Sequence, residues 1–157
     1  MQFSQNGWVA SPDKNAIGVK NFQVPETQRH FSCATAVAPI LIAFAAEFHK
    51  NIEPIDVGTY DDWGYNFAVI PGSNSYANHS SGTAIDIDAT LHPWHKKGTF
   101  NPIKLVKLQL LVKKYGLRWG GNYVHSTDEM HFEIVETPIQ VRARITSMKL
   151  PMPQVSK

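Results

Sequence analysis

A short stretch of this chain alternates strictly between apolar and acidic residues, which restricts it to a half-buried β-strand. In residues 83–89, Ile85 and Ile87 point to one side of the backbone, whereas Asp86 and Asp88 point to the other. A side chain fixed on a strand cannot swing far, so the two carboxylates stay on one surface. We therefore expect a strand with an apolar face toward the core and an acidic face toward a cleft.

A second alternating stretch lies about forty-five residues later, at 130–135, and puts His131 and Glu133 on one face. Residues 117–121 are expected to form a further strand that ends at a Gly-Gly pair. Residues 52–70 are expected to supply two short extended pieces around a turn. The polar faces of the strands can then border one cleft.

The other elements are predicted to be helices. Apolar residues recur at helical spacing within residues 36–48, a run too short and too interrupted to span a membrane. A second helix is expected from Pro102 to Gly116, and a third from Thr137 to about Met148. The predicted fold class is α+β, a small antiparallel sheet with flanking helices.

Length and composition favour one soluble domain. A chain of 157 residues fits a single unit, and no repeat or linker interrupts it. We expect a domain over residues 1–157, with loose ends at 1–7 and 151–157. A net charge of only +2 with scattered basic residues argues against a nucleic-acid partner.

Cys33 is the only cysteine, so no internal disulfide and no thiolate cluster can form. Beside an apolar run, a lone thiol is more often a small buried hydrophobe than a nucleophile. Any bound metal must therefore use histidines and carboxylates.

The first residues lack both a basic start and an apolar stretch, so they do not indicate a secretory signal. We expect the protein to be made in the cytoplasm, and to need another exit route if its substrate lies outside the membrane.

The first motif that carries chemistry is HSSGTAID, from His79 to Asp86. Imidazole and carboxylate both suit zinc, and Gly82 permits a tight turn that brings His79 back toward Asp86. A histidine and an aspartate seven residues apart are common, so this pair alone is a weak signal.

The second motif, DEMHFE, runs from Asp128 to Glu133 and makes the signal specific. His131 supplies a third ligand, and three protein ligands with an open fourth position are the pattern of catalytic zinc. Asp128 lies close enough in sequence to exchange a proton with an attacking water, and Glu133 is a candidate to orient an imidazole.

Weaker candidates have plain structural alternatives. Asp88 shares a predicted face with Asp86 and is either a neighbour of the metal site or a solvated strand carboxylate. Trp119 is a core or cleft-wall aromatic more often than a substrate contact. The histidines outside the two motifs have no ligand spacing and are not assigned to the site; they are His30, His49, His92, His95 and His125.

Together the two motifs resemble those of the zinc peptidases of the D-alanyl-D-alanine carboxypeptidase and L-alanyl-D-glutamate endopeptidase family. Residues 61–65 (DDWGY), 78–82 (NHSSG) and 115–121 (YGLRWGG) are similar to peptidase domains of phage lysins. The resemblance implies a hedgehog-like peptidase fold, one zinc per chain held by the two histidines and Asp86, and Asp128 as the catalytic carboxylate.

The chain departs from the family pattern upstream of the first motif. The family usually carries arginine in a stretch like Tyr-Arg-Pro-Ile-Arg-Gly, whereas Ala68 and Pro71 stand at those places here. Ala77 replaces a serine that helps to hold substrate. A slower reaction is expected unless Arg29 or Arg118 supplies the lost charge.

Two classes of function follow. The first is a hydrolase that cuts a peptide bond in the stem peptide of bacterial peptidoglycan, acting as a monomeric phage endolysin that is made in the host cytoplasm and released to the wall. The second is a catalytically weakened, zinc-containing module that binds the cell wall. Retention of Asp128 favours the hydrolase, because a carboxylate beside an open metal position has no evident structural purpose.

Overall fold

The computed structural model describes all 157 residues, and its central sheet carries the polar strands predicted from sequence. Strands β5 (Ala84–Asp86), β6 (Leu117–Trp119) and β7 (His131–Ile134) form an antiparallel sheet in the order β5-β7-β6. The register of β5 and β7 places Asp86 directly opposite His131. The second motif therefore meets the first across the middle of the sheet.

Three helices accompany the sheet: α1 (Ala38–Asn51), α2 (Pro102–Tyr115) and α3 (Pro138–Met148). The predicted helix ends are set by local chemistry. The side chain of Asn101 accepts a hydrogen bond from the backbone of Lys104 at the start of α2, and Gly116 ends that helix with a φ of +66°. The predicted α+β class, with helices on a small antiparallel sheet, is confirmed.

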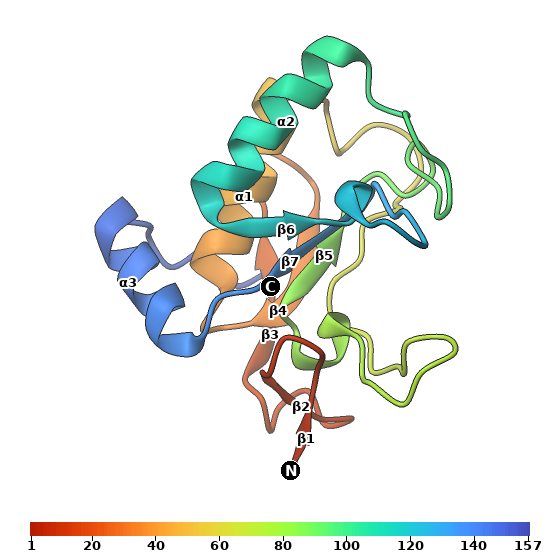
Figure 1. Cartoon of the computed structure of the whole chain (residues 1–157). Coiled ribbons are helices and arrows are strands. Elements are labelled where there is room, and N and C mark those ends of the chain that lie inside the picture. The colour runs from red at the N-terminus through yellow and green to blue at the C-terminus, as the bar shows by residue number, and fades with distance from the viewer.

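The core lies between helices α1 and α2, which run side by side, and the sheet (Figure 1). Phe44 and Phe48 on α1 are fully buried and pack their rings against Phe132 of β7. Phe132 lies directly after His131 in the strand, so its burial points the histidine to the opposite face. The apolar periodicity of α1 thus fixes the orientation of the polar face of β7.

A hairpin that the sequence did not indicate lies beside this core. Strands β3 (Val19–Gln23) and β4 (His30–Ala34) pair along five residues. Strand β3 has only two apolar residues, three positions apart, so it lacks the period of two that marks a strand. Cys33 on β4 is completely buried, and burial raises the pKa of its thiol, as expected for a small core residue.

Residues 52–70 do not form the two extended pieces that we expected. This segment makes only isolated bridges, from Trp63 to Asp86 and from Val69 to Tyr76. The Trp63 backbone exchanges two hydrogen bonds with that of Asp86, at 2.8 and 3.0 Å. The edge of β5 that faces away from β7 is therefore covered, and Asp86 is fixed from both sides.

The chain ends, which we expected to be loose, are hydrogen-bonded to the rest of the protein. At the start, strand β1 (Gln2–Phe3) pairs with β2 (Val9–Ala10), and the buried Ser4 hydroxyl donates to Ser81 Oγ at 2.7 Å. At the other end, the backbone of Ser156 donates to Asn21 O at 2.8 Å. Single polar side chains and backbone groups make these contacts, which no periodic pattern reveals.

Helices long and apolar enough to cross a membrane are absent from this structure.

Phe44→Ala should lower the free energy of unfolding by about 3–5 kcal/mol, the usual cost of removing a buried aromatic ring. Denaturant unfolding measures this change. Ile103→Ala on α2 is the control, because Ile103 is 72% exposed and its truncation should change the stability by less than about 0.5 kcal/mol. Equal effects of the two substitutions would contradict the placement of the core.

Candidate metal centre

The three residues of the predicted ligand set come from three backbone positions that meet at one end of the sheet. His79 lies in a short 3-10 helix, Asn78–Ser81, Asp86 ends β5, and His131 begins β7. Gly82 ends the 3-10 helix with a φ of +66°, and a Cβ there would lie 2.7 Å from the backbone nitrogen of Ala34. Only glycine fits this turn, which returns His79 to the sheet.

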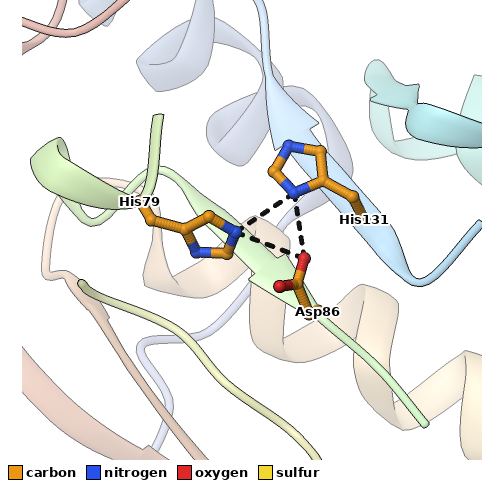
Figure 2. Close-up of side chains that lie close together, drawn as sticks. All are labelled: His79, Asp86 and His131. Carbon is orange, nitrogen blue, oxygen red and sulfur yellow. Dashed lines mark hydrogen bonds and ion pairs between the residues drawn. The ribbon is translucent and has the colours of Figure 1, made fainter. Parts of the chain in front are cut away.

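The side chains converge on one point (Figure 2). His79 Nε2 lies 3.2 Å from Asp86 Oδ1, and His131 Nδ1 lies 2.9 Å from the same oxygen. The two ring nitrogens are 3.1 Å apart. Ligand atoms of a tetrahedral zinc ion are separated by about 3.3 Å when the bonds are about 2.0–2.1 Å long, so the triangle has the size of a zinc site.

The outer ring nitrogens determine which atoms face the centre. His79 Nδ1 lies 2.7 Å from the backbone oxygen of Gly64, and His131 Nε2 lies 3.0 Å from Glu133 Oε2. Both oxygens are acceptors, so each outer nitrogen carries the proton and each inner nitrogen presents a lone pair. Two lone pairs and a carboxylate oxygen then face one another, and they repel unless a cation or a proton lies between them. The donor set therefore fits a metal ion.

The negative charges around His131 also favour a positive charge at the centre of the triad. Burial lowers the pKa of this imidazole, but the hydrogen bonds and charges of Asp86 and Glu133 outweigh burial and raise the pKa to about 10. Burial raises the pKa of Asp86, yet the neighbouring His79 and His131 bring it below its usual range. A metal at this position displaces a proton that the same charges hold, so metal and proton compete.

Glu133 holds His131 in position. Its Oε2 accepts hydrogen bonds from His131 and from the Asn78 side chain, and its Oε1 accepts from Arg118 Nε and, at 2.8 Å, from Tyr123 Oη. Glu133 is only 2% exposed, so this carboxylate is a rigid buried anchor. It orients the ring of His131 in the way that carboxylates behind metal-binding histidines usually do.

Asp128 lies on the wall of the same cleft, and the Gly-Gly pair fixes its backbone. The Asp128 amide donates to Gly120 O at 3.0 Å, and a Cβ on Gly120 would lie 2.3 Å from Asp128 O. Asp128 Oδ1 is buried and has no hydrogen-bond partner. Burial and the charge of Asp86 raise the pKa of Asp128 to about 6, against the lowering effect of the nearby histidines. A carboxylate with a free oxygen and a raised pKa is suited to proton transfer.

The cleft above the triad has a volume of about 570 Å³ and contains residues that the sequence did not assign to it. Its walls include Trp94, His95, Arg118 and Tyr123. Arg118 had a usable signal, because it stands between the apolar Leu117 and Trp119 in a predicted strand, which places it on the opposite face from both. His95 lies in a loop without periodicity, and no sequence signal marked it.

Two of the weaker candidates lie elsewhere. Asp88 does not share the face of Asp86. Strand β5 ends at Asp86, and Asp88 has a φ of +50° and a buried side chain beside Asp61 and Asp62, outside the cleft. Burial and the charge of Asp62 raise the pKa of Asp88 to about 8. Trp119 belongs to the hydrophobic core rather than to the cleft, and its indole N–H donates to Glu129 O at 2.8 Å.

Of the two arginines considered as substitutes for the missing family arginines, only one lies at the cleft. Arg118 lines the cleft, whereas Arg29 is buried beside Asp62, away from the triad. Glu129, the carboxylate next to Asp128, is bound to the backbone of Gly98 and Thr99 and is absent from the cleft wall.

Residues 71–134 match a family model described as D-alanyl-D-alanine carboxypeptidase. The matched segment is less than half of the chain, but it includes all three residues of the triad and Asp128. No curated protein and no solved structure matches the chain. The match indicates a peptidase of the kind that acts on D-alanyl-D-alanine-type substrates of the cell wall, and such peptidases generally depend on a metal.

Glu133→Gln should weaken metal binding by about 10- to 100-fold, because the neutral amide no longer raises the basicity of His131. Competition with a chelator of known affinity measures this change. Glu136→Gln is the matched control, since Glu136 pairs with Arg144 outside the cleft. Native affinity in the Glu133 variant would remove Glu133 from the support of the site.

Proposed function

We propose that the protein is a zinc-dependent peptidase that hydrolyses a peptide bond in the stem peptide of bacterial peptidoglycan. The observation that carries this proposal is the position of Asp128. Asp128 lines the same cleft as the three candidate metal ligands, and one of its carboxylate oxygens has no hydrogen-bond partner. A structural metal site needs no such carboxylate, whereas a hydrolase needs one.

Zinc suits the donor set better than the other common divalent ions. Two imidazole nitrogens and one carboxylate oxygen form a borderline-soft set, and all three residues line the cleft, so a zinc ion held by them would be within reach of water and substrate. When bound there, zinc polarises the scissile carbonyl and lowers the pKa of a water molecule. We propose one zinc per chain, with the whole site formed by a single monomer.

Asp128 performs the proton transfers in this proposal. The scissile peptide bond lies in the cleft above the triad, and a water molecule attacks its carbonyl carbon. Asp128 accepts the proton of that water and then delivers it to the nitrogen of the leaving amine. The raised pKa of Asp128 favours the second step, because the carboxyl group holds the proton until the amine takes it.

Arg118 is the group best placed to replace the missing arginines. Its Nε donates to Glu133, and its other nitrogens make no hydrogen bond within the chain. Those nitrogens remain available to a substrate oxygen in the cleft. Pro71 lines the cleft without offering charge, and Ala68 does not line it. We propose that Arg118 on β6 supplies the positive charge that Ala68 and Pro71 do not.

We propose that the protein acts as a phage endolysin, made in the host cytoplasm and released to the wall. The match to a cell-wall peptidase model and the resemblance of residues 61–65 and 115–121 to lysin domains support this. The alternative is a zinc-containing module that binds the cell wall without cutting it, and the loss of the family arginines favours that alternative.

Asp128→Asn should keep the fold and the zinc but lower peptidoglycan hydrolysis by about a hundredfold or more, the usual share of a positioned acid-base group. The digest is analysed by mass spectrometry for newly freed amino termini, which also identifies the bond that is cut. Asp13→Asn is the matched control, because Asp13 is exposed and does not line the cleft. If the native protein frees no terminus, the binding module replaces the hydrolase.

Arg118→Met should lower kcat by about 10²–10³-fold and change KM much less, because the lost interaction strengthens only in the transition state. Steady-state kinetics on a soluble stem peptide measure both constants. Arg144→Met is the control, since Arg144 pairs with Glu136 outside the cleft. An unchanged kcat would mean that another cleft residue, such as His95, stabilises the developing charge.

A further inference from the structure

A second group of carboxylates lies outside the cleft, in the interior of the protein. Asp61, Asp62 and Asp88 are 7%, 3% and 3% exposed. One oxygen from each lies within 4.8 Å of the others. None of these residues lines the cleft above the triad. Three negative charges buried so close together need compensation.

The hydrogen bonds in this group leave oxygens without donors. Asp61 Oδ2 accepts from the Thr90 amide at 2.8 Å, and Asp62 Oδ1 accepts from the Asp88 amide at 3.0 Å. Asp62 Oδ2 and Asp88 Oδ2 are buried without a hydrogen-bond partner. Asp88 is the decisive residue, because its side chain receives no hydrogen bond while one of its oxygens belongs to the cluster.

Arg29 is the only arginine beside these carboxylates, and it donates its hydrogen bonds to backbone oxygens. Arg29 Nε lies 3.1 Å from Asp62 Oδ2, but it donates to the backbone oxygen of Ile55 at 2.8 Å. Arg29 Nη2 donates to Thr59 O at 3.0 Å. The guanidinium therefore contributes charge without satisfying the carboxylate oxygens.

Charge balance indicates the kind of occupant. Carboxylates that bind a metal ion are deprotonated, and in that state the three carboxylates and Arg29 sum to −2. The neighbouring Glu53 does not alter this sum, because it is paired with Lys104 at 2.6 Å and is also bound to His92. A divalent cation makes the group neutral.

We propose that Asp61, Asp62 and Asp88 bind a calcium ion. An all-oxygen, acidic donor set suits a hard cation, and calcium tolerates irregular geometry. Calcium contacts oxygen at about 2.3–2.6 Å, so oxygens up to about 5 Å apart can share one ion. The separation of at most 4.8 Å meets this condition.

The ion would brace the strand that carries Asp86. Asp61 and Asp62 precede Trp63, whose backbone pairs with that of Asp86, and Asp88 follows Asp86 by two residues. The backbone of Ala89 also donates to Asp61 O at 3.2 Å. One cation therefore links the segments on both sides of a zinc ligand, without itself reaching the cleft.

The test is thermal unfolding of the full chain, purified with zinc, with and without added calcium chloride. Calcium at a hundred times its Kd should raise the Tm by about 5–10 °C. Asp88→Asn should abolish the shift, and asparagine suits the positive φ of this position. Asp61→Asn should weaken the shift, and Asp13→Asn should keep it. His79→Ala should also keep the shift, because that residue belongs only to the cleft site.

Metal analysis by mass spectrometry completes the experiment. One calcium per chain in the native protein, absent from Asp88→Asn, supports the proposal. The proposal is overturned if about 10 mM calcium, tenfold above the Kd of about 10⁻³ M of the weakest calcium modules, neither shifts the Tm nor binds. It is also overturned if Asp88→Asn retains the native shift, or if magnesium stabilises the protein equally and calcium is not selected. None of these outcomes depends on peptidase activity.

Discussion

Mutual repulsion between three electron-pair donors is the constraint around which the site is organised. His79 Nε2, His131 Nδ1 and Asp86 Oδ1 lie within 3.2 Å of one another, and each histidine uses its other nitrogen to bind an oxygen acceptor. Nothing on the chain satisfies the inward lone pairs. The arrangement is stable only with a positive occupant, and a proton or a metal ion can fill that place. The geometry thus indicates a metal site because the lone pairs repel one another without a cation. This evidence is independent of the residue types.

The fold keeps the three ligand atoms close together, despite their repulsion, because all three residues stand on backbone that is fixed by its neighbours. β7 pairs with β5 so that His131 is opposite Asp86, and Trp63 covers the other side of Asp86. Phe132, packed on α1, prevents β7 from turning its polar face inward. If the side chains moved apart, the repulsion would vanish and so would the affinity for a metal. Rigid support is therefore as necessary to the site as the ligands themselves.

The sequence revealed the parts of the structure that obey a simple period or a local rule. The helices and the strands that carry the motifs were predicted because apolar spacing and capping residues such as Asn101 and Gly116 are local. The hairpin of β3 and β4 was not predicted, because the two apolar residues of β3, Val19 and Phe22, are too few to show a period. Asp88 was predicted to lie beside Asp86 by alternation alone, but β5 ends at Asp86 and the side chain of Asp88 is buried outside the cleft. His95 reaches the cleft through a loop whose path no pattern specifies.

Anomalous diffraction at the zinc absorption edge, from crystals grown with zinc, would locate the ion among the side chains. We expect a strong peak at about 2.0–2.2 Å from His79 Nε2, His131 Nδ1 and an oxygen of Asp86, with the remaining position open to the cleft. The peak should lie on the same side of the sheet as Asp128. No peak between these three atoms, or zinc held by other residues, would show that His79, Asp86 and His131 do not form the zinc site.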